Sequence, residues 1–109
     1  MAYDESLAER VRRLLDDPPE MVEKKMFGGV GFLVQGNMAC GVHQDYLIVR
    51  INPESHEAAL RQPHVRVFDL TGRAMKGWIV VEKDGIVEEE TLHHWIRKGI
   101  DFALTLPPK

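Results

Sequence analysis

The chain has 109 residues, of which 44% are hydrophobic and 28% are charged, and its formal net charge is −3. This size and balance are typical of one folded domain, which we place at residues 1–109. They exclude a general duplex DNA-binding protein, because such proteins carry a basic excess that neutralises phosphates. The start of the chain is acidic and polar rather than a secretory signal, no apolar run approaches the roughly 20 residues of a membrane helix, and one cysteine cannot form an internal disulfide. We therefore expect a cytoplasmic protein.

The first expected element is an amphipathic helix, because apolar residues recur at helical spacing from Leu7 to Leu15. Ser6 and Glu9 fit a capping box at its start, and Asp4 is the competing N-cap. The pair Pro18-Pro19 should end the helix, since proline has no backbone donor and constrains the residue before it.

A glycine-rich stretch follows and organises the rest of the chain. Its apolar residues are those of a buried strand, yet glycine packs no side chain there, so the strand should bulge, bend or admit a close neighbour. We expect one curved strand that ends near Val34, with residues 21–25 leading into it. The residues expected to be structural here are Phe27, Gly28, Gly29 and Gly31.

The middle of the chain predicts an antiparallel meander. A hairpin turn at residues 35–37 precedes a strand over 38–42, and a second turn at 43–45 precedes a strand over 46–51. In that last strand Leu47, Val49 and Ile51 share one face, and Tyr46, Ile48 and Arg50 share the other.

The second half predicts a short helix, two strands and a long helix. Asn52 is a good cap for the short helix, which Pro63 ends, and strands are expected over 65–68 and 77–82. The long helix should run from about Glu88 to Ala103, with Trp95 as its anchor on the sheet. Gly99 lies in its packed stripe and would be tolerated there if the helix approaches the sheet closely.

The element order α-β-β-β-α-β-β-α indicates an α+β class. We expect a two-layer domain with an antiparallel sheet of about five strands and helices on one face.

No motif predicts catalysis, a cofactor or a metal. The glycines lead into a strand rather than a helix, which is wrong for a phosphate-binding or dinucleotide-binding loop. Cys40 and His43 lie three apart on one strand and should point to opposite faces, so Cys40 is expected to be a small buried residue. His93 and His94 are interpreted as part of a solvated helix face. We therefore expect that the protein is not an enzyme.

The candidate binding residues are Arg73, Lys76, Trp78, Lys24 and Lys25. Cations around an aromatic ring could stack on a nucleobase or hold an acidic peptide, with the two lysines nearby in the sheet. Alternation along the strand favours the other interpretation, in which Trp78 belongs to the core and the charges form its rim. Gly77, directly before Trp78, is expected to be structural.

Four segments together resemble one family, the TfoX/Sxy N-terminal domain family. They are Lys25-Met26-Phe27-Gly28-Gly29-Val30-Gly31-Phe32, Gly36-Asn37-Met38, Gly72-Arg73-Ala74-Met75-Lys76-Gly77-Trp78 and Leu106-Pro107-Pro108-Lys109. The resemblance runs from about Leu7 to the last residue. It implies a fold similar to that of secretion chaperones and a relation to regulators of natural competence, which act with a transcription factor. Those regulators also carry a C-terminal domain, whereas we expect this chain to be a stand-alone N-terminal domain that ends at Lys109.

The resemblance and the charge balance favour a non-enzymatic protein-interaction or regulatory module, whose partner could be a transcription regulator. A single-stranded nucleic-acid or RNA-binding domain is the alternative, in which case binding should weaken steeply with salt. Pairing of sheet edges could also give a homodimer.

Overall fold

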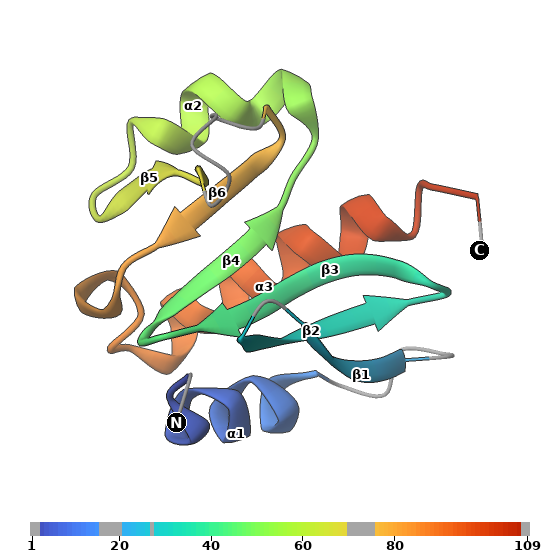
Figure 1. Cartoon of the computed structure of the whole chain (residues 1–109). Helices are drawn as coiled ribbons and strands as arrows, with labels where there is room; N and C mark the ends of the chain where they lie inside the picture. The colour runs from blue at the N-terminus through green and yellow to red at the C-terminus, as the bar shows by residue number, and fades with distance from the viewer. Residues whose placement is uncertain (1–2, 16–20, 27, 70–75, 108–109) are drawn as a thin grey trace.

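The computed structural model describes residues 3–15, 21–26, 28–69 and 76–107, and Figure 1 shows how they are arranged. The elements in chain order are α1 (Glu5–Leu14), β1 (Met21–Met26), β2 (Gly29–Val34), β3 (Asn37–His43), β4 (Tyr46–Arg50), the 3-10 turn η1 (Pro53–Ser55), α2 (His56–Leu60), β5 (Val65–Val67), β6 (Trp78–Val81), η2 (Lys83–Gly85) and α3 (Glu89–Ala103). No helix among these residues is long and apolar enough to cross a membrane.

The sheet has six strands in the order β1-β2-β3-β4-β6-β5, and every neighbouring pair is antiparallel. The α+β class is confirmed, but the expected count of about five strands is wrong. Residues 21–26 form a strand of their own, where we expected only a lead-in. The chain reverses at Gly28, which has a φ of +76°, a value that glycine adopts without steric strain. The glycine-rich stretch therefore makes a hairpin instead of one long strand.

Two details of the meander follow from local backbone geometry. The turn between β2 and β3 is made by Gln35 and Gly36, which both have positive φ, as in the two-residue hairpin turns that match strand twist. Asn37 is already the first residue of β3 rather than part of the turn. The expected bulge occurs where the β2–β3 register shifts between Phe32 and Leu33.

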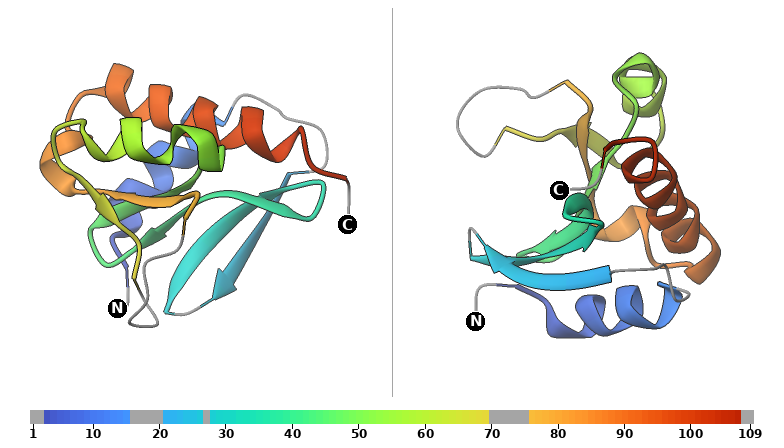
Figure 2. Two further views of the ribbon diagram at one scale, coloured as in Figure 1. Left: turned by 90° about the horizontal axis from the view of Figure 1, so that it is seen from above. Right: turned by 90° about the vertical axis from the view of Figure 1, so that its right-hand side faces the viewer.

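The helices cover one face of the sheet. α1 and α3 contact each other and β3, and α2 packs beside β5 and β6. Figure 2 shows that the sheet is strongly bent, with β1 and β2 turned away from β4 and β6, and that α1 and α3 lie outside the bend. The side chains facing the helices build the core, among them Phe32, Val49 and Ile79, all nearly inaccessible to solvent.

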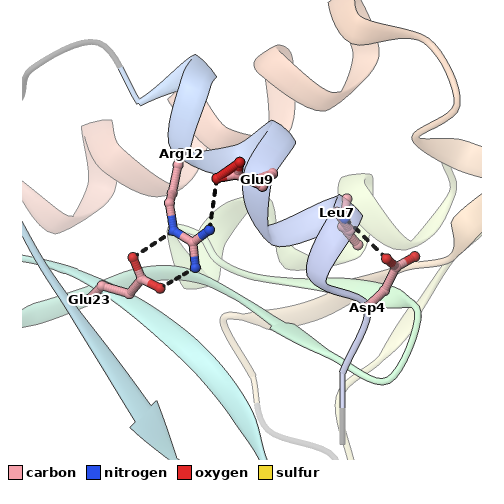
Figure 3. Close-up of polar contacts among 5 residues, drawn as sticks. All are labelled: Asp4, Leu7, Glu9, Arg12 and Glu23. Carbon is pink, nitrogen blue, oxygen red and sulfur yellow. Dashed lines mark hydrogen bonds and ion pairs between the residues drawn. The ribbon is translucent and has the colours of Figure 1, made fainter. Parts of the chain in front are cut away.

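α1 begins at Asp4, whose side-chain oxygen accepts a hydrogen bond from the backbone N–H of Leu7. The expected capping box at Ser6 is therefore wrong, because the competing cap lies one position before the helix. Figure 3 shows this cap and the ion pair that ties α1 to β1, in which Arg12 Nε donates to Glu23 Oε2 at 2.8 Å. That hydrogen bond lowers the pKa of Glu23.

α3 packs with the expected stripe, because Trp95 and Gly99 are buried together with four apolar neighbours. Gly99 lies against the backbone of β3: a Cβ added there would sit 2.2 Å from the carbonyl oxygen of Ala39. The close approach expected from the sequence is thus confirmed. Cys40, on the same strand, is fully buried, and this burial raises the pKa of its thiol to about 12.

Hydrogen bonds attach both ends of the described chain to β3. The backbone N–H of Asp4 donates to the carbonyl of Gln44, directly after β3, at 2.6 Å. The buried Asn37 side chain, at the start of β3, donates to the carbonyl of Pro107 at 2.9 Å. Leu104 is 45% exposed, so the Asn37 side chain, rather than packing of Leu104, attaches this segment to the sheet.

Candidate functional site

A groove of about 410 Å³ lies between the η1–α2 segment and α3. Figure 2 shows these two segments passing close to each other over one end of the sheet. The bottom of the groove is apolar and buried, formed by Ile51, Ala59 and Trp95. Its walls carry exposed hydrogen-bonding side chains, namely Asn52, Ser55, Gln62, His94, Lys98, Asp101 and Thr105.

The groove combines apolar burial with polar walls, which suits a ligand that has both kinds of surface. Ser55, His94 and Asp101 line it together, so a hydrolytic triad has to be considered. His94 and Asp101 are seven residues apart on α3, a rise of about 10.5 Å, too far for the required hydrogen bond. The carboxylate of Asp101 instead faces Arg97 at 3.8 Å. The geometry of these three residues therefore fits binding and does not fit triad chemistry.

An arginine–aromatic cluster adjoins the groove. Arg50, the last residue of β4, is paired with Trp78 across the β4–β6 ladder. Its guanidinium carbon lies 5.2 Å from the centre of the Trp78 ring and 5.6 Å from that of Phe102. The Phe68 ring packs against the Trp78 ring, with the two ring centres 6.1 Å apart. Because Phe102 also lines the groove, the cluster and the groove share one side chain.

The structure separates the five candidate binding residues. Trp78 is half-buried within the cluster, and Lys76 is exposed two residues before it. Arg73 lies outside the described residues. Lys24 and Lys25 are on β1, four strands from β6 and roughly 19 Å away along the sheet. They also point to opposite faces, so the expectation that the two lysines approach Trp78 is wrong.

The expected structural glycines have defined roles where they are described. Gly29 has no room for a side chain, because a Cβ there would meet the backbone of Val42. Gly77 has a φ of +90°, accepts a hydrogen bond from the N–H of Ile51 at 2.8 Å and donates to Nδ1 of His56 at 3.1 Å. Gly31 lies in β2, paired with Lys24 and Gly41, and Phe27 is outside the described residues.

The histidines considered from the sequence differ in their surroundings. His43 does not join Cys40 but bonds the Tyr46 hydroxyl at 2.7 Å. No group of three potential metal ligands occurs among the residues that the structure describes. His94, interpreted from sequence as a solvated residue, is exposed but lines the groove beside Trp95.

Sequence reasoning missed Arg50, Phe102 and the groove itself. The sequence does contain one indication of the groove. Polar residues recur at helical spacing beside the packed face of α3, namely His94, Lys98, Asp101 and Thr105. The ring of His56 is buried and accepts a hydrogen bond from the backbone N–H of Gly77, and no pattern in the sequence indicates this contact.

The fold and the groove define a two-layer α+β domain in which two helices present one shared surface. Residues 13–103 match the TfoX N-terminal domain, and the chain belongs to that family. The comparison with curated proteins found no significant match.

Proposed function

We propose that the protein is a non-catalytic, cytoplasmic interaction module that binds a segment of another protein in the α2–α3 groove. The groove carries this proposal, because an apolar bottom between hydrogen-bonding walls suits a peptide with buried side chains and an exposed backbone. Trp95 at the bottom and Phe102 on the wall are of the residue types that dominate binding energy in protein interfaces. A regulatory role, with a transcription regulator as partner, is consistent with membership of the TfoX N-terminal domain family.

The test is a pull-down from the native host with tagged protein, after nuclease treatment, using two matched variants. Ala58→Arg places a long cation in the groove, and Thr91→Arg makes the same charge change on an exposed part of α3 outside it. Proteins retained by the wild type and by Thr91→Arg but lost with Ala58→Arg would support groove binding. An identical set of proteins on both variants would refute it.

Binding of single-stranded nucleic acid on the opposite sheet face is the second candidate. The specific observation is a second cation–aromatic pair, in which Arg66 lies 5.0 Å from the centre of the Tyr46 ring on the face without helices. Arg66 is, however, also paired with Glu82 at 3.4 Å, and the net charge of −3 opposes polyanion binding. Salt-sensitive binding of an oligothymidylate, reduced by Arg66→Gln, would favour this function over the first.

A further inference from the structure

Arg50 contacts two aromatic rings, and its guanidinium donates no hydrogen bond to another residue that the structure describes. Its guanidinium carbon lies 5.2 Å from the centre of the Trp78 ring on β6 and 5.6 Å from the centre of the Phe102 ring on α3. Contact with two aromatic rings restricts the movement of a guanidinium, whose five N–H donors lie along its edges. Those edges match the geometry of a carboxylate, which an arginine can bind with two parallel hydrogen bonds.

Burial and ion pairing together distinguish Arg50 from the other arginines that the structure describes. Within the described ranges four arginines face a carboxylate within 4.0 Å, and they are Arg10, Arg12, Arg66 and Arg97. Arg13 and Arg61 have no such partner there but are exposed. Among the described residues, no carboxylate is paired with Arg50, although Arg50 is half-buried. Lys98, on the groove wall, is exposed and has no carboxylate partner among these residues either. A half-buried cation without an internal partner is suited to an anion from outside.

Both cations are neighbours of Phe102. Lys98 precedes Phe102 by one turn of α3 and lines the groove with it, while Arg50 contacts the Phe102 ring. Asp101 is the acidic group of this wall, and its charge is opposed by Arg97 at 3.8 Å. A segment that lies in the groove and passes Phe102 would therefore meet two cations that the described part of the chain leaves without a counter-charge.

We propose that the groove recognises an acidic segment of a partner protein, with an apolar side chain on Trp95 and an Asp or Glu carboxylate on Arg50. This inference rests on the proposed function and names the class of partner. The net charge of −3 means that the protein as a whole does not attract acidic chains over long distances. The recognition is therefore short-range, and it depends on contact with the Arg50 guanidinium.

The experiment starts from a phage-displayed library of random 12-residue peptides selected on the immobilised full chain. We expect the selected peptides to pair a large apolar residue with Asp or Glu. Affinity is then measured by fluorescence anisotropy for the strongest peptide. Arg50→Gln should weaken it about tenfold or more, because a charge-assisted hydrogen-bond pair is lost. Arg13→Gln removes the same charge from the exposed side of α1 and should leave affinity unchanged.

Two tryptophans allow the two parts of the site to be read separately, since the chain contains only Trp78 and Trp95. In a ¹⁵N-labelled sample, the peptide should shift the indole N–H signals of both, Trp95 from the groove and Trp78 from the Arg50 cluster. If Arg50→Gln does not fold, as judged by circular dichroism, Lys98→Gln and Arg50→Lys supply the test. Lys98 is exposed, and a lysine at position 50 keeps the charge without the planar donors, so each should also weaken binding.

The outcomes separate the inference from the function on which it rests. Peptides without acidic residues, or an affinity unaffected by Arg50→Gln while Trp95 still shifts, would overturn the acidic anchor and leave the groove in place. No selected peptide, or peptides indifferent to Ala58→Arg, would refute groove binding and the inference with it. If an oligothymidylate displaces the peptide, the acidic-segment inference is refuted, and the Arg50 cluster is part of a nucleic-acid-binding site.

Discussion

Replacement of Gly99 by alanine tests the close contact between α3 and β3. In an ordinary helix interior this change is stabilising, by about 1 kcal/mol. Here the new Cβ would lie 2.2 Å from the carbonyl oxygen of Ala39 and 3.0 Å from its carbon, both backbone atoms of a central strand. Relief of that overlap requires α3 and β3 to separate by roughly 1 Å, and overpacking of this kind costs about 1–3 kcal/mol.

A 2.2 Å contact with a backbone oxygen belongs at the upper end of that range, about 2–3 kcal/mol, because no flexible side chain can move aside. After subtraction of the gain in helix propensity, of about 1 kcal/mol, we expect Gly99→Ala to lower the free energy of unfolding by about 1–2 kcal/mol. The assay is urea unfolding followed by circular dichroism, where a loss of this size moves the midpoint by roughly 0.5–1 M. Thr91→Ala, on the exposed face of the same helix, is the control and should be neutral or slightly stabilising. A Gly99→Ala protein as stable as the wild type would refute the close approach.

Three further predictions concern the core, its thiol and the α1–β1 ion pair. Trp95→Ala should destabilise the protein by about 3–5 kcal/mol in the same urea assay, because a buried ring is removed; a loss under about 1 kcal/mol would show that Trp95 does not anchor α3. Burial raises the pKa of Cys40 to about 12, so iodoacetamide should modify the thiol in denaturant but hardly at pH 8 in native buffer, and rapid native labelling would contradict this. The bond to Arg12 lowers the pKa of Glu23, so the pair stabilises the fold above the ordinary carboxyl pKa of 4.5, and this stabilisation is lost as the pH falls through the lowered value. Glu23→Gln should thus cost about 0.5–1 kcal/mol at pH 7 and progressively less in acid, whereas a pH-independent difference would point to another cause.

Local patterns were sufficient for most elements. The packed stripe of α3, the Asn52 cap and the strand that became β4 all depend on neighbours within a few residues, and all three occur in the structure. Burial along β4 does not alternate, however, because Ile48 is buried as well as Leu47 and Val49. The strand β1 was missed because its sequence, Met-Val-Glu-Lys-Lys-Met, lacks the alternation of a half-buried strand. An edge strand tolerates such charges, and they protect it from pairing with other chains.

The candidate site was predicted less well, because it depends on long-range pairing. Trp78 was chosen from sequence with cations near it in the chain, yet its actual cation is Arg50, which meets it only through the β4–β6 register. The groove needs α2 and α3 on the same face and at one end of the sheet, which local periodicity does not specify. Cross-strand register and helix placement are properties of the whole fold, so residues such as Arg50 and Phe102 emerge only from the structure.

The attachment of both chain ends to β3 has a mechanical consequence. Under a stretching force applied between residues 4 and 107, the outermost contacts with β3 are the hydrogen bonds at Gln44 and at Asn37, and the packed faces of α1 and α3 bear the load after them. Such isolated bonds open one at a time, unlike a strand ladder pulled along its length, in which several bonds must break together. The terminal segments should therefore peel away at low force while the six strands stay paired, and the domain would yield in steps before its sheet ruptures.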